Sequence, residues 1–120
     1  LRAILNYGHT FGHAIENLTH YSMFTHGIAV SLGMRVAARA AVLLGKISAE
    51  AEARQNKLLD GLGFPKKYDI DTEAAWDAMA VDKKAEKGKR VYILPTKIGE
   101  VEKVSNIDKD IITQSWGAIK

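Results

Sequence analysis

Hydrophobic side chains recur along the first part of the chain with the period of an α-helix. Within residues 3–19, apolar positions follow one another at steps of seven, four and three, at Ile4, Phe11, Ile15 and Leu18. Residues 27–44 are apolar on almost every side, and their charged residues are Arg35 and Arg39. A helix that is hydrophobic on most faces is a buried one. The pattern therefore predicts an amphipathic helix followed by a central, buried helix.

The remainder of the chain is predicted to form shorter helices and one β-hairpin. Gly45 ends the central helix, Ser48 caps the next helix, and Pro95 and Gly99 bound the connection of the hairpin. The predicted elements are a helix over 49–59, a loop over 63–71, a helix over 72–83, strands over 90–94 and 100–104, and a helix over 109–118. The predicted fold class is mainly α, one helical domain over residues 1–120 that carries a small hairpin.

Composition narrows the classes of function. The 120 residues are 47% hydrophobic, which suffices for one core, and they include no cysteine. Disulfides and thiolate metal sites are therefore excluded, and the chain fits a reducing cytoplasm. The net charge is +3, whereas a nucleic-acid-binding domain has a stronger, clustered basic face with stacking aromatic side chains. We expect no nucleic-acid partner, and no membrane segment because no charge-free run of 18 apolar residues occurs.

Polar side chains form a second stripe on the first predicted helix. His9 and His13 are four positions apart and stack on one helical face, which Asn6 and Glu16 extend at spacing three. Two histidines at this spacing, with a third ligand from elsewhere, commonly bind zinc. The alternative is a pair of helix histidines that bind no metal and whose nitrogens are hydrogen-bonded to protein or water, because such a pair can have the same spacing. Thr10 stands where a zinc protease carries its glutamate base, so protease chemistry is excluded.

Two glycines lie on the same predicted helix. Gly8 and Gly12 each weaken a helix by about 1 kcal/mol relative to alanine. Because they are four positions apart, they predict that another element or a ligand approaches the backbone closely at this face.

Four longer motifs follow one another along the chain. They are R-A-I-L-N-Y-G-H-T-F-G-H-A-I-E, H-G-I-A-V-S-L-G-M, D-K-K-A-E-K-G-K-R-V-Y-I-L-P and K-I-G-E-V. In this order they resemble the 3-dehydroquinate synthases and their sugar-phosphate cyclase relatives. The resemblance runs from residue 2 to about residue 104 and concerns the C-terminal, mostly helical domain of that family. It implies a fragment whose NAD⁺-binding N-terminal domain lies outside this sequence.

The resemblance implies roles for the histidines. His9 and His26 correspond to two protein ligands of a catalytic Zn²⁺ or Co²⁺, and the third ligand is a glutamate upstream of this chain, so Glu16 is not expected to replace it. His13 corresponds to a companion histidine that contacts the substrate and assists proton transfer. Neutral imidazoles are good zinc ligands, and His26 can meet the stripe of His9 only if their two helices pack side by side.

The resemblance also implies contacts to the substrate. Asn6 corresponds to a catalytic substrate contact in the same cavity. Arg2 and Lys84 correspond to cationic residues that bind the anionic groups of a sugar phosphate, and Lys83 is the alternative to Lys84 in the D-K-K run. The planar fork of an arginine suits bidentate binding of phosphate or carboxylate.

One position departs from the family pattern. Most 3-dehydroquinate synthases read H-G-E where this chain reads H-G-I, with Ile28 in place of the acid. If Thr25 is the N-cap, position 28 is the third helical residue, where a glutamate closes a capping box. A glutamate there could instead orient His26, in which case its loss would weaken metal binding.

The function implied is that of the C-terminal metal- and substrate-binding part of 3-dehydroquinate synthase. This phosphate-eliminating lyase of the shikimate pathway converts 3-deoxy-D-arabino-heptulosonate 7-phosphate to 3-dehydroquinate and phosphate. The alternatives are another sugar-phosphate cyclase such as 2-deoxy-scyllo-inosose synthase, a metal-dependent polyol dehydrogenase, and a non-catalytic helical module. We expect a small sugar phosphate as partner, allow a homodimer in the full-length enzyme, and expect the isolated fragment to be inactive.

Overall fold

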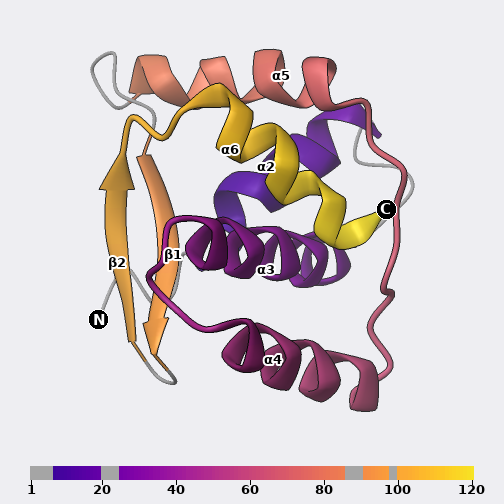
Figure 1. Ribbon diagram of the computed structural model, residues 1–120. Helices are drawn as coiled ribbons and strands as arrows, with labels where there is room; N and C mark the ends of the chain where they lie inside the picture. Colours follow the sequence, from indigo (N-terminus) through magenta and orange to yellow (C-terminus); the bar gives the residue numbers. More distant parts are fainter. Residues whose placement is uncertain (1–6, 20–24, 86–90, 98–99) are drawn as a thin grey trace.

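Figure 1 shows the computed structural model of the protein. The structure describes residues 7–19, 25–85, 91–97 and 100–120, and for residues 80–85, 91 and 97 it describes the backbone alone. In chain order the elements are α2 His9–Leu18, α3 His26–Leu43, α4 Ala49–Gly61, α5 Thr72–Ala85, β1 Val91–Lys97, β2 Glu100–Ser105, α6 Lys109–Ser115 and the 3₁₀ helix η1 Trp116–Ile119. The predicted fold class, mainly α with one antiparallel hairpin, is confirmed.

Side chains and glycines end the helices much as predicted. Thr25 Oγ1 accepts a hydrogen bond from the amide of Ile28 at 3.3 Å, and Ser48 caps α4 in the same way at 3.1 Å. At the end of α3, Gly45 takes a left-handed φ of 74°, and the amides of Gly45 and Lys46 turn back to carbonyls of the last turn at 3.0 and 2.8 Å.

Three predicted boundaries are wrong. The first helix was expected from residue 3, but Gly8 has a φ of 82°, a left-handed conformation that interrupts a helix, so α2 begins at His9. The first strand was expected to stop before Pro95, which instead lies inside β1 opposite Val101, beside a register shift. The last helix was expected over 109–118, but it changes to 3₁₀ geometry at Trp116.

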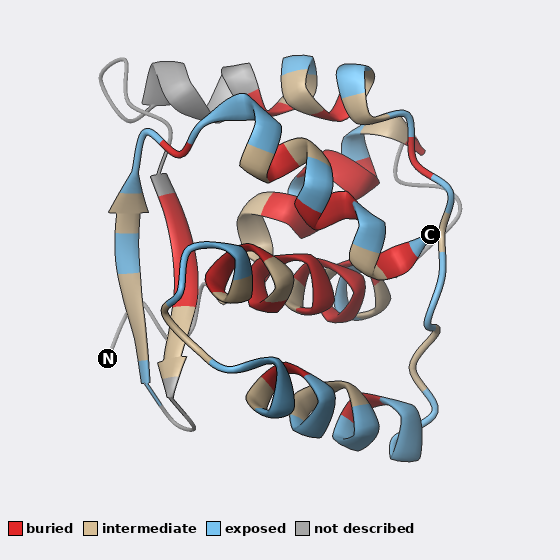
Figure 2. Ribbon diagram, in the orientation of Figure 1, coloured by how far each residue is buried: buried red, intermediate tan, exposed pale blue. Residues whose placement is uncertain are grey.

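The core surrounds α3, which lies at the centre of Figure 1 with α2 and α6 on one side and α4 on the other. Figure 2 shows that most of α3 is buried, whereas α4 is exposed along much of its length. Aromatic rings from three distant segments meet here, since Phe11 stacks on Tyr92 at 5.7 Å between centroids and meets Trp116 edge-on at 5.4 Å.

Helix α3 is long and apolar enough, by length and mean hydropathy alone, to cross a membrane. In this fold its apolar side chains have protein partners, because ten of its 18 residues are buried against the neighbouring elements. Burial inside the domain thus accounts for the hydropathy of this central helix, as the sequence pattern predicted.

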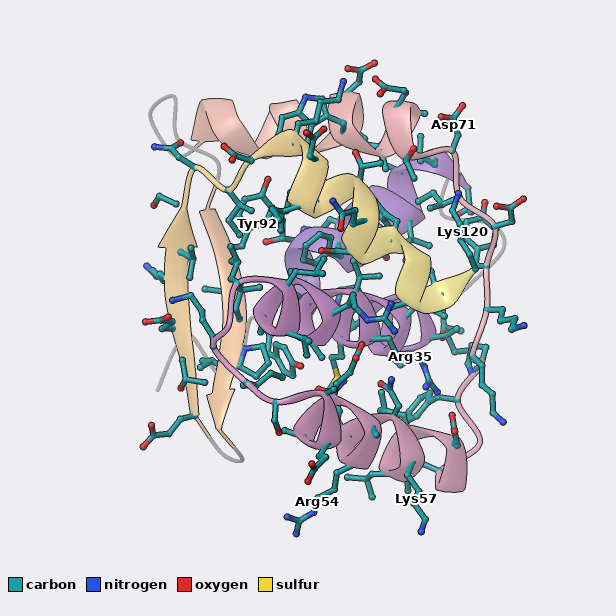
Figure 3. All side chains as sticks on the ribbon, viewed as in Figure 1. Arg35, Arg54, Lys57, Asp71, Tyr92 and Lys120 are labelled. Carbon is teal, nitrogen blue, oxygen red and sulfur yellow. The ribbon has the colours of Figure 1, made fainter. Side chains whose placement is uncertain are left out.

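Polar pairs attach α4 to α3. The guanidinium of Arg35, with 3% of its side chain exposed, contacts Asp60 at 2.8 Å and donates to the Pro65 carbonyl at 3.1 Å. Arg39 contacts the buried carboxylate of Glu52 at 2.7 Å. Figure 3 shows Arg35 between the two helices, where Asp60 compensates its charge and both Nε and Nη2 donate hydrogen bonds. The two charges that interrupt the apolar pattern of α3 are therefore structural.

Candidate metal centre

Glycines bring the backbones of α2 and α3 together. A methyl group placed on Gly33 of α3 would lie 2.2 Å from the carbonyl oxygen of Gly8 and 2.7 Å from the amide nitrogen of Gly12. A methyl group on Gly12 would lie 3.1 Å from atoms of both Ala29 and Val30. The close approach predicted from Gly8 and Gly12 is confirmed, and the approaching element is α3. Gly33 was not recognised from the sequence as a third part of this contact.

Three imidazoles converge where this contact places the start of α3 beside α2. His26 is the first residue of α3, and His9 and His13 lie one turn apart on α2. The ring centroids are 5.1 Å apart for His9 and His26, 5.7 Å for His9 and His13, and 6.0 Å for His13 and His26. We call these three residues the histidine cluster. It has solvent access, because His13 and His26 are exposed and His9 is half-buried.

A buried carboxylate lies against the histidine cluster. Oε1 of Glu16 is 3.0 Å from Nδ1 of His26, and only 8% of the Glu16 side chain is exposed, against 55% for His26. The ligand atoms of His13, Glu16 and His26 all lie within 4.8 Å of one another. Imidazole nitrogens and carboxylate oxygens are the donors that Zn²⁺ and related divalent ions accept, so this set of side chains fits such a metal.

The backbone beside the cluster orients His9. Nδ1 of His9 is 3.4 Å from the carbonyl oxygen of Tyr7, and because a carbonyl can only accept, a hydrogen bond there requires the proton on Nδ1. Nε2 then keeps the lone pair that a metal needs. Tyr7 is itself fixed: its hydroxyl is hydrogen-bonded to Gln55, whose amide donates to the Met34 carbonyl at 3.2 Å. Burial raises the pKa of the Tyr7 phenol well above its usual value, so this hydroxyl stays protonated.

The structure thus brings together His9, His13 and His26, the predicted site residues that it describes. Arg2 and Asn6 lie outside the described residues, as do the side chains of Lys83 and Lys84.

Sequence reasoning missed the contact between Glu16 and His26. The signal was present, since Glu16 continues the histidine stripe three positions after His13. Thr25 caps α3 and makes Ile28 its third residue, as the capping interpretation of that position required. The carboxylate that contacts His26 comes from α2, not from position 28.

Solved structures share this fold. The chain aligns with 2-epi-5-epi-valiolone synthase from Streptomyces hygroscopicus, with NAD⁺ and Zn²⁺ bound, at a TM-score of 0.83 and 22% identity, covering 92% of this chain and 31% of that one. It aligns with 2-deoxy-scyllo-inosose synthase complexed with carbaglucose-6-phosphate, NAD⁺ and Co²⁺ at a TM-score of 0.80 and 24% identity, covering 97% and 34%. This chain therefore has the fold of the aligned third of these two synthases.

Relatives found by sequence have a higher sequence identity to this chain than these two solved structures do. The chain is 47% identical over 116 residues to the 3-dehydroquinate synthase of Nostoc punctiforme, and 45% identical over 117 residues to that of Acaryochloris marina. The alignments cover 95% and 96% of this chain and 32% of each relative, so the chain spans about a third of their length. A family model described as 3-dehydroquinate synthase C-terminal matches residues 1–85. Because that model covers most of its length, this chain belongs to the 3-dehydroquinate synthase C-terminal family.

Proposed function

We propose that this chain is the metal- and substrate-binding part of an enzyme that converts 3-deoxy-D-arabino-heptulosonate 7-phosphate to 3-dehydroquinate and phosphate, a step of aromatic amino acid biosynthesis. The observation that carries the proposal is the histidine cluster at the α2–α3 contact. Its support from sequence is the 47% identity to a 3-dehydroquinate synthase.

In this proposal His9 and His26 hold the metal, and a carboxylate from the upstream part of the full-length protein completes the site. A bound Zn²⁺ or Co²⁺ supplies Lewis-acid polarisation of the substrate oxygens. His13 is kept for proton transfer, because its exposed ring lies close to both other rings and can contact a substrate that reaches the site. Arg2 and Lys84 bind the anionic groups of the substrate, and Asn6 is a further substrate contact.

The proposal assigns the redox step to NAD⁺, which carries hydride chemistry. We expect NAD⁺ to bind mainly to the part of the protein that corresponds to the other two thirds of the relatives. The present chain then contributes the metal ligands, the anion contacts and the proton-transferring group. A site divided in this way requires both parts to be held in register, since a misplacement of about 1 Å can cost about 10²-fold in rate.

A second candidate is another sugar-phosphate cyclase. The neighbour with carbaglucose-6-phosphate bound shares this fold at a TM-score of 0.80. In that case the substrate would be a hexose phosphate, and Ile28, where most 3-dehydroquinate synthases carry glutamate, would mark the difference.

The test joins this chain to the upstream part of the Nostoc punctiforme enzyme and measures phosphate release with NAD⁺ and Zn²⁺. The proposal expects release from the heptulosonate phosphate and little from glucose 6-phosphate. The opposite preference would favour the second candidate, and release from neither by a chimera that binds zinc would refute both.

The histidine roles are separable in the same chimera. His9→Ala and His26→Ala are expected to lose metal and activity together, measured by zinc titration and phosphate release. His13→Ala is expected to retain zinc while losing turnover, typically 10²–10⁴-fold for a general acid–base residue. If His13→Ala loses zinc and His9→Ala retains it, the ligand set is the group formed by His13, Glu16 and His26.

A further inference from the structure

We propose that Glu16 is a positioning residue of the metal centre: its buried carboxylate accepts a hydrogen bond from Nδ1–H of His26 and thereby presents Nε2 of that ring to the metal. The inference rests on the proposed function for the metal, but the state of the imidazole that it describes exists without any metal. It assigns to Glu16 a role beside the ligands rather than among them.

The carboxylate of Glu16 is buried. The Glu16 side chain is 8% exposed, although it lies on a helix whose next residue, Asn17, is exposed. Burying a carboxylate is costly unless it accepts hydrogen bonds. Nδ1 of His26, 3.0 Å from Oε1, provides a donor at ordinary hydrogen-bond distance. Glu16 is the buried and more constrained partner, so this hydrogen bond fixes the orientation of the exposed His26 ring.

The contact with Glu16 also selects the tautomer of His26. A neutral imidazole carries one proton, and the nitrogen opposite that proton is the one that can coordinate a metal. An ionised carboxylate can only accept, so its contact with Nδ1 places the proton there and leaves the lone pair on Nε2. Histidine ligands of metals commonly donate their second nitrogen to a carboxylate or a backbone carbonyl. His9 meets the same rule, because its Nδ1 faces the Tyr7 carbonyl.

His26 lies at a position in the fold where few other groups can orient its ring. It is the first residue of α3, and more than half of its side chain is exposed, so packing against the rings of His9 and His13 restrains its ring only in part. Thr25 fixes the backbone at this point by capping the helix. Ile28, two positions further on, has a hydrocarbon side chain that cannot accept a hydrogen bond. Restraint of the ring at Nδ1 therefore comes from α2, through Glu16.

The competing assignment makes Glu16 a direct metal ligand together with His13 and His26, because the ligand atoms of these three residues lie within 4.8 Å of one another. That assignment requires the carboxylate to contact the metal, while the observed contact is a hydrogen-bond distance to the imidazole. The two assignments differ in what glutamine does at this position. An amide oxygen can still accept from Nδ1, but it is a poor substitute for a carboxylate ligand.

The experiment uses the 120-residue chain without metal and then with Co²⁺ as the probe. Long-range ¹H–¹⁵N spectra, recorded where the imidazoles are neutral, report which nitrogen of His26 carries the proton. We expect the Nδ1–H tautomer in the wild type and in Glu16→Gln, and a shift towards Nε2–H in Glu16→Leu. Glu52→Gln is the matched control, since it alters a carboxylate of similar burial that pairs with Arg39 instead.

Cobalt titration followed by visible absorption gives the second readout. Glu16→Leu is expected to weaken Co²⁺ binding 10–100-fold, Glu16→Gln less than that, and Glu52→Gln not at all. An Nε2–H tautomer of His26 in the wild type overturns the inference, and that measurement needs no variant to fold. Equal loss of cobalt in Glu16→Gln and Glu16→Leu, as large as in His26→Ala, also overturns it and makes Glu16 a ligand. A tautomer that follows Glu16 in a chain that binds no metal supports the positioning of the ring; the proposed function is judged separately, by phosphate release from the chimera, whose upstream part supplies the third ligand.

Discussion

Replacing Gly33 by alanine tests whether the glycine contact holds the metal centre together. The new methyl group would lie 2.2 Å from the Gly8 carbonyl oxygen and 2.7 Å from the Gly12 amide nitrogen. Both atoms belong to the backbone, so no side-chain rotation relieves the clash. Because non-bonded carbon–oxygen contacts lie above 3 Å, α2 and α3 must separate by about 1 Å.

The cost follows from two opposing terms. Overpacking a tight contact costs about 1–3 kcal/mol, and alanine regains up to about 1 kcal/mol of helix propensity over glycine. We therefore expect a net loss of about 1–2 kcal/mol, or roughly 4–10 °C in Tm for a domain of this size. The same displacement moves His26 relative to His9, whereas metal–ligand distances tolerate only about 0.2 Å. Metal affinity should fall together with stability.

Thermal unfolding by circular dichroism and zinc titration measure the two effects. Gly27→Ala is the matched control for stability, because it lies in the same helix and a methyl group there meets nothing within 4 Å. Gly61→Ala is the control for metal binding, since it also has open space and lies at the end of α4. If Gly33→Ala melts with the controls and binds zinc as the wild type does, the glycine contact does not position the site.

Further predictions concern the substrate contacts, the buried ion pair and the isolated chain. In the full-length protein, Arg2→Ala and Lys84→Ala should each weaken binding of the phosphate-bearing substrate by about 1.5–3 kcal/mol. Inhibition by inorganic phosphate should weaken in parallel, which measures the loss of the anion contact. A large effect of Lys83→Ala with none of Lys84→Ala would show that Lys83 is the residue that contacts the substrate. Asp60→Asn should destabilise the chain by about 1.5–3 kcal/mol in urea unfolding, because it pairs with a buried guanidinium, whereas Asp69→Asn, which alters a 92% exposed carboxylate, should change it by less than about 0.5 kcal/mol. The isolated chain should release no phosphate from the heptulosonate phosphate with NAD⁺ and Zn²⁺; turnover by it alone would contradict the proposed division of the site.

Local patterns predicted the elements well where one residue decides the geometry. Thr25, Ser48 and Gly45 mark the helix ends that they were expected to mark, because capping depends on neighbours within a few residues. The start of the first helix was predicted wrongly at Gly8, because the apolar period of the sequence continues through this residue while its backbone has a left-handed conformation. Pro95 was expected to end a strand, but in a two-stranded hairpin every strand is an edge strand and tolerates proline.

The candidate site could be predicted from the sequence only in part. The stripe of His9, His13 and Glu16 follows from helical periodicity alone. The place of His26 depends on how α3 crosses α2, which is decided by contacts at Gly33 that no period reveals. For the same reason, the sequence could not identify the nitrogen that faces Glu16. The sequence thus predicted that another element approaches Gly8 and Gly12, but the partner glycine and the orientation of the rings required the structure.

This arrangement links metal affinity to helix packing. The proposed ligands His9 and His26 come from the two helices that the glycines join, and the packing of these helices places their rings 5.1 Å apart. Little binding free energy is then spent on bringing the helices together, which is the advantage of preorganisation. The linkage is reciprocal, since a metal that binds only the packed form stabilises it in proportion to its affinity. A third ligand from upstream would extend the same linkage to the rest of the protein, so that metal binding joins the two parts of the active site.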